Sequence, residues 1–137
     1  HDAKNPGAHK FVVTSDPDQL KEVAGYYDFI RDTVAAEHDY NVYLSLLKTD
    51  GVHICVGAPP TPSALRAFSL IPGRKSIAGS SIGGLPETQE MLDFCSEHSI
   101  VSDIELIRAD EINNAYERMV KGDVKYRFVI DYGTLSA

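Results

Sequence analysis

Four short runs of apolar, often β-branched residues mark predicted strands in the first half of the chain. Each run is bounded by glycine, proline or other turn-forming residues. The predicted strands are residues 10–15 (KFVVTS), 26–35 (YYDFIRDTVA), 52–59 (VHICVGAP) and 75–84 (KSIAGSSIGG). The third run is almost continuously apolar, which is typical of a strand buried on both faces of a parallel sheet.

The segments between these runs have helical patterns. Residues 17–25 carry a proline in the first turn and a glycine at the end, and residues 38–51 have apolar side chains at positions 43, 44, 46 and 47. Residues 61–73 are predicted to form a helical or irregular crossover. The regular alternation of strand and helix predicts right-handed βαβ units in a doubly wound, Rossmann-like sheet.

The pattern changes after the fourth run. Residues 85–99 predict a helix, and the segments that follow predict a strand, a helix and a strand at 102–109, 110–123 and 125–132. Asp110 is expected to cap the second of these helices and Gly122 to end it. The predicted fold class is therefore α/β: a partial Rossmann-like parallel sheet of four strands over residues 1–85, followed by a small α+β segment over residues 86–137.

The first residues suggest that the chain is a piece of a longer protein. Residues 2–9 (DAKNPGAH) have the pattern of a helix tail that ends at proline and glycine, which is an unusual place for a protein to begin. The strand predicted at 10–15 would then lack its neighbour. We expect it to lie beside residues 27–34, to pair with another chain, or to be poorly ordered.

Composition narrows the possible partners. The 137 residues carry a formal charge of −7, which disfavours binding to a phosphate backbone, and lysine and arginine are scattered singly. We therefore expect no nucleic-acid partner. Hydrophobic residues make up 43% of the chain and charged residues 24%, values ordinary for a globular protein, so no membrane association is expected.

Cysteine, histidine and glycine give few signs of a local active site. Cys55 and Cys95 lie forty residues apart in apolar runs, which favours free thiols and a cytoplasmic location, although a disulfide remains possible. The five histidines form no pair at metal or triad spacing, so no metal ligand and no catalytic residue is assigned. Neither GxGxxG nor GxxxxGK[ST] occurs, so the chain has no phosphate loop of a known type.

Four stretches together carry a resemblance to a known family. They are residues 27–36 (YDFIRDTVAA), 46–59 (LLKTDGVHICVGAP), 79–105 (GSSIGGLPETQEMLDFCSEHSIVSDIE) and 112–131 (INNAYERMVKGDVKYRFVID). The chain resembles the carboxyl-terminal part of the zinc-dependent medium-chain alcohol dehydrogenases, in the branch of the cinnamyl alcohol dehydrogenases and bacterial aldehyde reductases. The resemblance implies hydride transfer between NADP(H) and a primary alcohol or aldehyde held on a catalytic zinc. It also implies that the zinc ligands, the proton relay and the phosphate loop precede residue 1, and that residues 86–137 belong to the catalytic domain.

The resemblance further implies which residues face the cofactor. These are Thr33, Val34, Val56, Gly57, Ser80, Ile82 and Arg127, the last as a donor to the pyrophosphate. Gly57 has an alternative role as a simple turn former, and Arg127 as a surface ion pair. The family also forms dimers through its last Rossmann strand, so a homodimer through residues 76–82 is expected.

Two functions remain open at this point. The first is a fragment of an NADP(H)-dependent zinc alcohol dehydrogenase or aldehyde reductase whose 137 residues alone are inactive. The second is a stand-alone, non-catalytic module for cofactor binding or dimerisation. The sequence specifies neither the physiological alcohol or aldehyde nor the choice between NADP and NAD.

Overall fold

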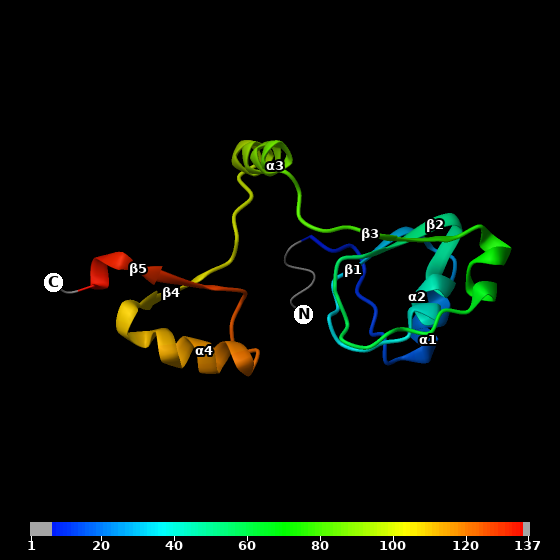
Figure 1. Cartoon of the computed structure of the whole chain (residues 1–137), viewed down its shortest axis with the longest axis horizontal. Helices are drawn as coiled ribbons and strands as arrows, with labels where there is room; N and C mark the ends of the chain where they lie inside the picture. The colour runs from blue at the N-terminus through cyan, green and yellow to red at the C-terminus, as the bar shows by residue number, and fades with distance from the viewer. Residues whose placement is uncertain (1–6, 136–137) are drawn as a thin grey trace. The chain divides into compact units, whose positions relative to one another are not determined.

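The computed structural model describes residues 7–135, so the predicted helix tail at 2–9 lies mostly outside the described residues. The chain divides into two compact units between Ile82 and Gly83, shown in Figure 1. This division falls three residues before the predicted one. The assignment of the second unit to a catalytic domain stays a prediction.

The first unit contains a parallel three-stranded sheet in the order β1-β2-β3. Its strands are β1 (Tyr27–Asp32), β2 (Leu47–Cys55) and β3 (Ser76–Gly79), and its helices are α1 (Pro17–Glu22) and α2 (Tyr40–Leu46). Two short 3-10 helices, Ala67–Ser69 and Ile71–Gly73, form the crossover from β2 to β3. The α/β class with parallel strands is confirmed.

The predicted strand at 10–15 is wrong, and the sheet has three strands rather than four within the described residues. The segment instead runs into the start of α1, where Asp16 caps the helix by accepting from the amides of Asp18 and Gln19. The amide of Val13 donates to the Gln19 side chain at 2.9 Å rather than to a strand. An apolar run needs a paired neighbour to become a strand, and this run makes side-chain and turn contacts in its place.

Helix α2 is shorter than predicted because the chain turns into β2 at Leu47. Leu47 has extended backbone angles and pairs with Tyr27, after which the register shifts so that Val52 lies opposite Phe29. Gly51 packs closely against this corner, since a β-carbon at that position would lie 2.9 Å from that of Leu47. The apolar spacing continues past the helix because Leu47 is buried as part of the strand.

The core of the first unit is formed by residues of α2 and β2 together with Val23, which follows α1. The fully buried side chains are Val23, Leu44, Leu47 and His53. A histidine with no exposed surface among aliphatic residues is unusual, because both of its ring nitrogens need hydrogen-bond partners.

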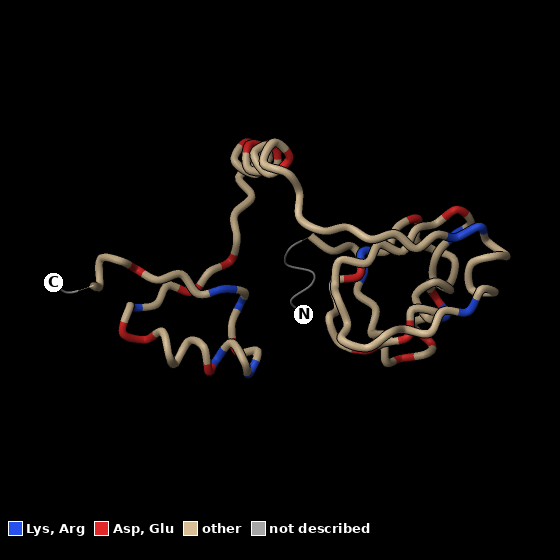
Figure 2. Tube along the Cα trace, viewed as in Figure 1, with Lys and Arg blue, Asp and Glu red and all other residues tan. Residues whose placement is uncertain are grey.

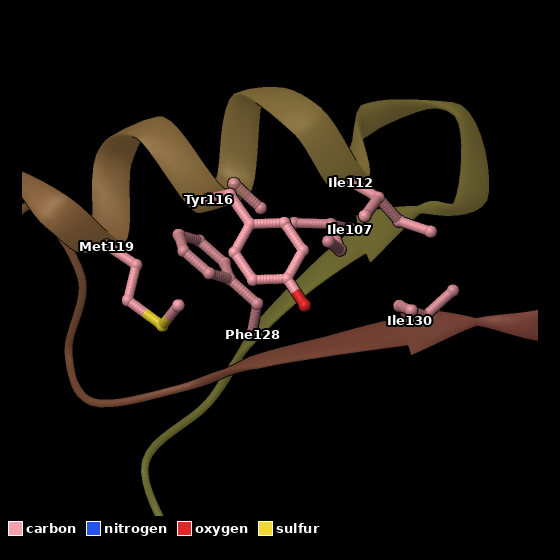
Figure 3. A pocket seen from close by; sticks show the side chains of 7 residues that line it. Ile107, Ile112, Tyr116, Met119, Phe128 and Ile130 are labelled. Atoms are coloured by element: carbon pink, nitrogen blue, oxygen red, sulfur yellow. The ribbon is translucent and has the colours of Figure 1, made fainter.

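The second unit contains a pair of parallel strands with a helix packed on it. Its elements are α3 (Leu85–Glu97), β4 (Glu105–Arg108), α4 (Ile112–Val120) and β5 (Phe128–Asp131), with short 3-10 helices at Ala109–Glu111 and Tyr132–Thr134. Figure 3 shows the apolar groove between α4 and the two strands. It is lined by Ile107, Ile112, Ala115, Tyr116, Met119, Phe128 and Ile130.

The ends of α4 confirm one prediction and correct another. Gly122 adopts a left-handed φ of 69° just after the helix, and its amide bonds to the carbonyl of Met119. Asp110 does not cap the helix, because its carboxylate accepts from the Arg108 guanidinium and Glu111 stands at the cap position. Glu111 in turn accepts from the amide of Arg108, so the 3-10 turn is closed by its own side chains.

Charged positions are interspersed along both units, as Figure 2 shows. No helix within residues 7–135 has both the length and the apolar character needed to cross a bilayer.

Candidate cofactor-binding edge

The carboxyl ends of the three parallel strands lie at one edge of the sheet. Asp32, Cys55 and Gly79 occupy matching positions in the pairing of β1 with β2 and of β2 with β3. The residues that follow these positions therefore leave the sheet side by side. Open α/β sheets bind ligands at this edge, so it is the candidate site of the first unit.

Backbone hydrogen bonds hold the three strand ends together beyond the sheet itself. The carbonyl oxygen of Asp32 accepts from the amides of Val56 and Gly57, each at 2.9 Å. The amide of Ser80 donates to the carbonyl of Cys55 at 3.1 Å. Each turn is thus tied to the strand beside it.

Gly57 is required by a close approach of two backbones. A β-carbon at this position would overlap the carbonyl oxygen of Val34 and would lie 2.6 Å from its carbonyl carbon and 2.8 Å from that of Thr33. Gly79 ends the next strand and has ordinary space, because its nearest neighbour would be 4.0 Å away. The glycine after β2 therefore does more than form a turn.

The structure brings five of the seven predicted cofactor residues to this edge. They are Thr33, Val34, Val56, Gly57 and Ser80. Ile82 is the last residue of the first unit and has 95% of its surface exposed. Arg127 belongs to the second unit, where its carbonyl accepts from the amide of Glu105 just before β5. Contact of any of the seven with a cofactor stays a prediction.

Sequence reasoning missed a polar cluster directly behind this edge. Asp32, with 8% of its surface exposed, places Oδ2 2.6 Å from Nε2 of His38, while Oδ1 accepts from the amide of Val34 at 2.9 Å. His38 Nδ1 lies 2.8 Å from the carbonyl oxygen of Ala36. The available signal was an aspartate within the strand predicted at 26–35 with a histidine six residues later, and it matches no known motif spacing.

His53 approaches the same carboxylate from β2. Its Nε2 lies 3.3 Å from Asp32 Oδ2, within ion-pair distance, but neither ring nitrogen makes a hydrogen bond. The ring packs edge-on to Tyr40 at 5.1 Å and stacks with Tyr43 at 6.3 Å between centroids. The carboxylate is therefore shared unequally, and His38 holds the better geometry.

The environment moves the pKa values of all three groups. Burial lowers the pKa of His53 more strongly than the nearby Asp32 raises it, so this ring is held neutral. Burial opposes the charged form of His38 as well, but its bonds to Ala36 and Asp32 raise its pKa overall. The pKa of Asp32 is lowered, because the bond from Val34 and the two histidines outweigh its desolvation.

The described residues contain no cluster that could hold a metal by itself, and the amides at the edge are already bonded. No three histidine, cysteine, aspartate or glutamate side chains in residues 7–135 are placed together to bind a metal ion. The amides of Val34, Val56 and Gly57 are already bonded to Asp32. These three amides are therefore occupied and do not donate to a ligand.

A parallel sheet with a forced glycine at its carboxyl edge defines part of a Rossmann-like α/β domain. The chain belongs to the zinc-binding dehydrogenase family, whose model matches residues 1–97. This membership confirms the resemblance seen in the sequence.

Individual relatives point to the same family. The chain is 56% identical over 135 residues to aldehyde reductase YahK of Escherichia coli (strain K12), covering 98% of this chain and 39% of that protein. A solved cinnamyl alcohol dehydrogenase of Sorghum bicolor is 45% identical with a TM-score of 0.87, covering 95% of this chain and 37% of the other. A cinnamyl alcohol dehydrogenase of Helicobacter pylori complexed with NADP(H) is 38% identical with a TM-score of 0.70, covering 83% and 34%. The chain thus spans about two fifths of the length of these relatives or less.

Proposed function

We propose that this chain is the carboxyl-terminal part of an NADP(H)-dependent zinc alcohol dehydrogenase or aldehyde reductase. In the whole enzyme, hydride would pass between the nicotinamide and a primary alcohol or aldehyde. The names of the relatives support this reaction class, and one of them was solved with NADP(H). The two cysteines are free thiols, which agrees with the reducing cytoplasm that we propose as its location.

The observation that carries the proposal is the close approach of Gly57 to the Thr33–Val34 turn. Only a residue without a side chain lets the two turns meet. Because the amides of Val34, Val56 and Gly57 are occupied, we infer that carbonyl oxygens of these turns would face the ring. A nicotinamide carboxamide has an NH₂ group that such carbonyls accept. We assign this chain the task of orienting the ring, while NADPH supplies the hydride.

The remaining predicted contacts complete this assignment. Ser80 and Ile82 follow the next strand and would border the same ring, with Ile82 offering an apolar surface. Arg127 would donate to the pyrophosphate as a charged group. NADP rather than NAD rests on the relatives alone.

The 137 residues should not catalyse the reaction by themselves. The sequence contains no GxGxxG loop, and the described residues offer no metal site. Both would have to come from a part of the enzyme that this chain does not contain. We therefore derive no zinc chemistry from the residues of this chain.

Residues 76–82 are the proposed dimer contact. β3 is the last strand of the sheet and pairs with β2 on one side, so its other side is free to pair with a second copy. We expect sizing with light scattering to give twice the 15.0 kDa chain mass. A monomer at high concentration would contradict this contact.

A stand-alone binding or dimerisation module is the second candidate. The same β3 edge and the same inferred carbonyl contacts favour it, because neither needs the rest of an enzyme. The two candidates differ in what a longer protein containing this sequence does.

Activity assays separate these possibilities. We expect the 137-residue chain to show no NADPH oxidation with an aromatic aldehyde and added zinc, whereas a longer protein containing it turns over. Turnover by the 137-residue chain alone would refute its proposed inactivity. Absence of turnover in the complete protein, with NADPH still bound, would favour the module.

A further inference from the structure

His38 lies between two groups that can only accept hydrogen bonds. Its Nδ1 is 2.8 Å from the backbone carbonyl oxygen of Ala36, and its Nε2 is 2.6 Å from a carboxylate oxygen of Asp32. A carbonyl and an ionised carboxylate have no proton to give. Both contacts are hydrogen bonds only if both ring nitrogens carry a proton, which makes the ring an imidazolium.

Loss of that proton would leave one short contact between two lone pairs. A neutral imidazole has a single N–H, so it can bond Ala36 or Asp32 but not both. The side chain is 12% exposed, and water can replace the lost partner only at the exposed rim. His38 would therefore lose its bond either to Ala36, within the loop of residues 33–38, or to Asp32, at the end of β1.

The attachment to Asp32 matters because this residue also holds the candidate cofactor edge. Its other carboxylate oxygen accepts from the amide of Val34, and its carbonyl accepts from Val56 and Gly57. One residue thus links the histidine to both turns that meet at Gly57. His38 supplies the shortest contact to its second oxygen, at 2.6 Å, so a change at His38 acts on the residue that holds both turns.

We propose that protonated His38 is a positioning residue, which fixes the Thr33–Val34 turn through Asp32 and makes the candidate cofactor edge respond to the loss of one proton. The consequence for NADPH affinity rests on the function proposed above. The positioning of the turn does not, and it is measurable in the 137-residue chain without a ligand.

The groups around His38 are compatible with this role. His53 faces the same carboxylate from β2 but is held neutral by its burial, so it does not replace the charge. Tyr40 and Tyr43 of α2 pack edge-on to the His38 ring at 4.9 and 5.5 Å. His38 also lines a surface pocket, and the other charged residues that line this pocket are Glu37, Asp39 and Arg66.

The pKa of His38 supports the geometry. Burial of the ring lowers this pKa, and the bonds to Ala36 and Asp32 outweigh that effect and raise it. The charged ring therefore persists to higher pH than an exposed histidine would allow.

Two variants and a control test the proposal. In Asp32→Asn the amide oxygen can accept from Val34 while its NH₂ donates to His38, so a neutral ring then satisfies every contact. This substitution should reverse the response, with the turn ordered at high pH and loosened at low pH. His38→Gln removes the titration, and His98→Gln is the matched control, since His98 also contacts a backbone carbonyl but lies in the other unit, at the C-cap of α3.

Nitrogen NMR of the histidine rings and amide shifts are the first measurement. We expect both His38 nitrogens to be protonated at neutral pH, and the amide shifts of Val34 and Gly57 to titrate with the same midpoint. His38→Gln should abolish this titration and His98→Gln should leave it unchanged. A neutral His38 ring at neutral pH, or amide shifts that titrate equally in His38→Gln, would overturn the proposal.

NADPH titrations at several pH values are the second measurement. A charge-assisted bond is about twice as strong as a neutral one, so we expect affinity to weaken by about tenfold across the His38 titration, and not in His38→Gln. The phosphate of NADPH also titrates, but it does so in both experiments, so the difference between the wild type and His38→Gln reports His38 alone. Equal pH dependence in both proteins would overturn the proposal for the cofactor edge. If no NADPH binds at any pH while the amides titrate with His38, the cofactor function fails and the positioning role stands.

Discussion

Replacing Gly57 with alanine tests the packing of the candidate edge. The new β-carbon would overlap the carbonyl oxygen of Val34 and would lie 2.6 Å from its carbonyl carbon, whereas ordinary contact begins at 3.4 Å, so the turn has to move by more than about 0.8 Å. Overpacking of this kind costs about 1–3 kcal/mol in unfolding free energy. For a unit of this size, each kcal/mol lowers the midpoint of thermal unfolding by about 4–8 °C.

Gly79→Ala is the matched control at the end of the neighbouring strand. Its β-carbon would meet nothing closer than 4.0 Å, so we expect a midpoint within about 2 °C of the wild type. Thermal unfolding followed by circular dichroism measures both variants. NADPH fluorescence titrations should show binding weakened by about tenfold in Gly57→Ala, equivalent to about 1.4 kcal/mol. Equal midpoints and equal affinities for the two variants would refute the claim that the edge requires glycine after β2.

Further predictions concern the polar cluster and one buried lysine contact. The stability supplied by the raised pKa of His38 is fully present below its ordinary value of 6.5 and is lost as pH rises through the raised value. The unfolding free energy measured in urea should therefore fall with rising pH in this range, and His38→Gln should remove this fall. The lowered pKa of Asp32 adds stability above its ordinary value of 3.8, which is lost as pH falls through the lowered value; a curve without this acid loss would contradict the pairing. His53→Leu removes two buried nitrogens without hydrogen bonds and should raise the unfolding free energy by about 1 kcal/mol. The gain should be clearest below pH 6.5, because there only the unfolded ring gains a proton; a less stable variant at acid pH would count against this reading. Lys75→Met loses a 2.6 Å bond to the carbonyl of Leu44 in the last turn of α2 and should lower the unfolding free energy, measured with a denaturant, by about 1 kcal/mol. Lys48→Met breaks an exposed ion pair and should lower it by less than about 0.5 kcal/mol; equal losses would show that burial of the bond is not what matters.

Sequence pattern predicted most elements of this chain because its strands are apolar and its helices carry clear turn residues. The strand predicted at 52–59 corresponds to β2, which spans Leu47–Cys55, and the helix that begins after Gly84 has the expected proline in its first turn. These features are local, so a single sequence specifies them.

The errors arose where structure depends on a distant partner. Residues 10–15 have the composition of a strand, but no strand lies beside them, and composition does not report a neighbour. Leu47 extends the apolar spacing of α2, yet its burial serves β2, so the helix was predicted to end at residue 51 whereas it ends at Leu46.

The candidate edge was predictable in part. Gly57 was selected by resemblance as a residue that faces the cofactor, and the structure adds a separate reason for glycine there, which is the close backbone of Val34. The link between Asp32 and His38 was not found, because no motif joins an aspartate and a histidine six positions apart. Such a pair becomes visible only when the loop after β1 folds back on its own strand.

NMR mapping of NADPH on the isotope-labelled 137-residue chain tests the central claim most directly. We expect amide shifts to change at residues 33–34, 56–57 and 80–82, which follow the three strands at one edge of the sheet. The residues around Gly133, beside β5 of the other unit, serve as an internal reference. Shift changes confined to the predicted turns would support a nicotinamide-orienting edge. A saturating titration that leaves these turns unchanged, or that moves only residues elsewhere, would contradict it.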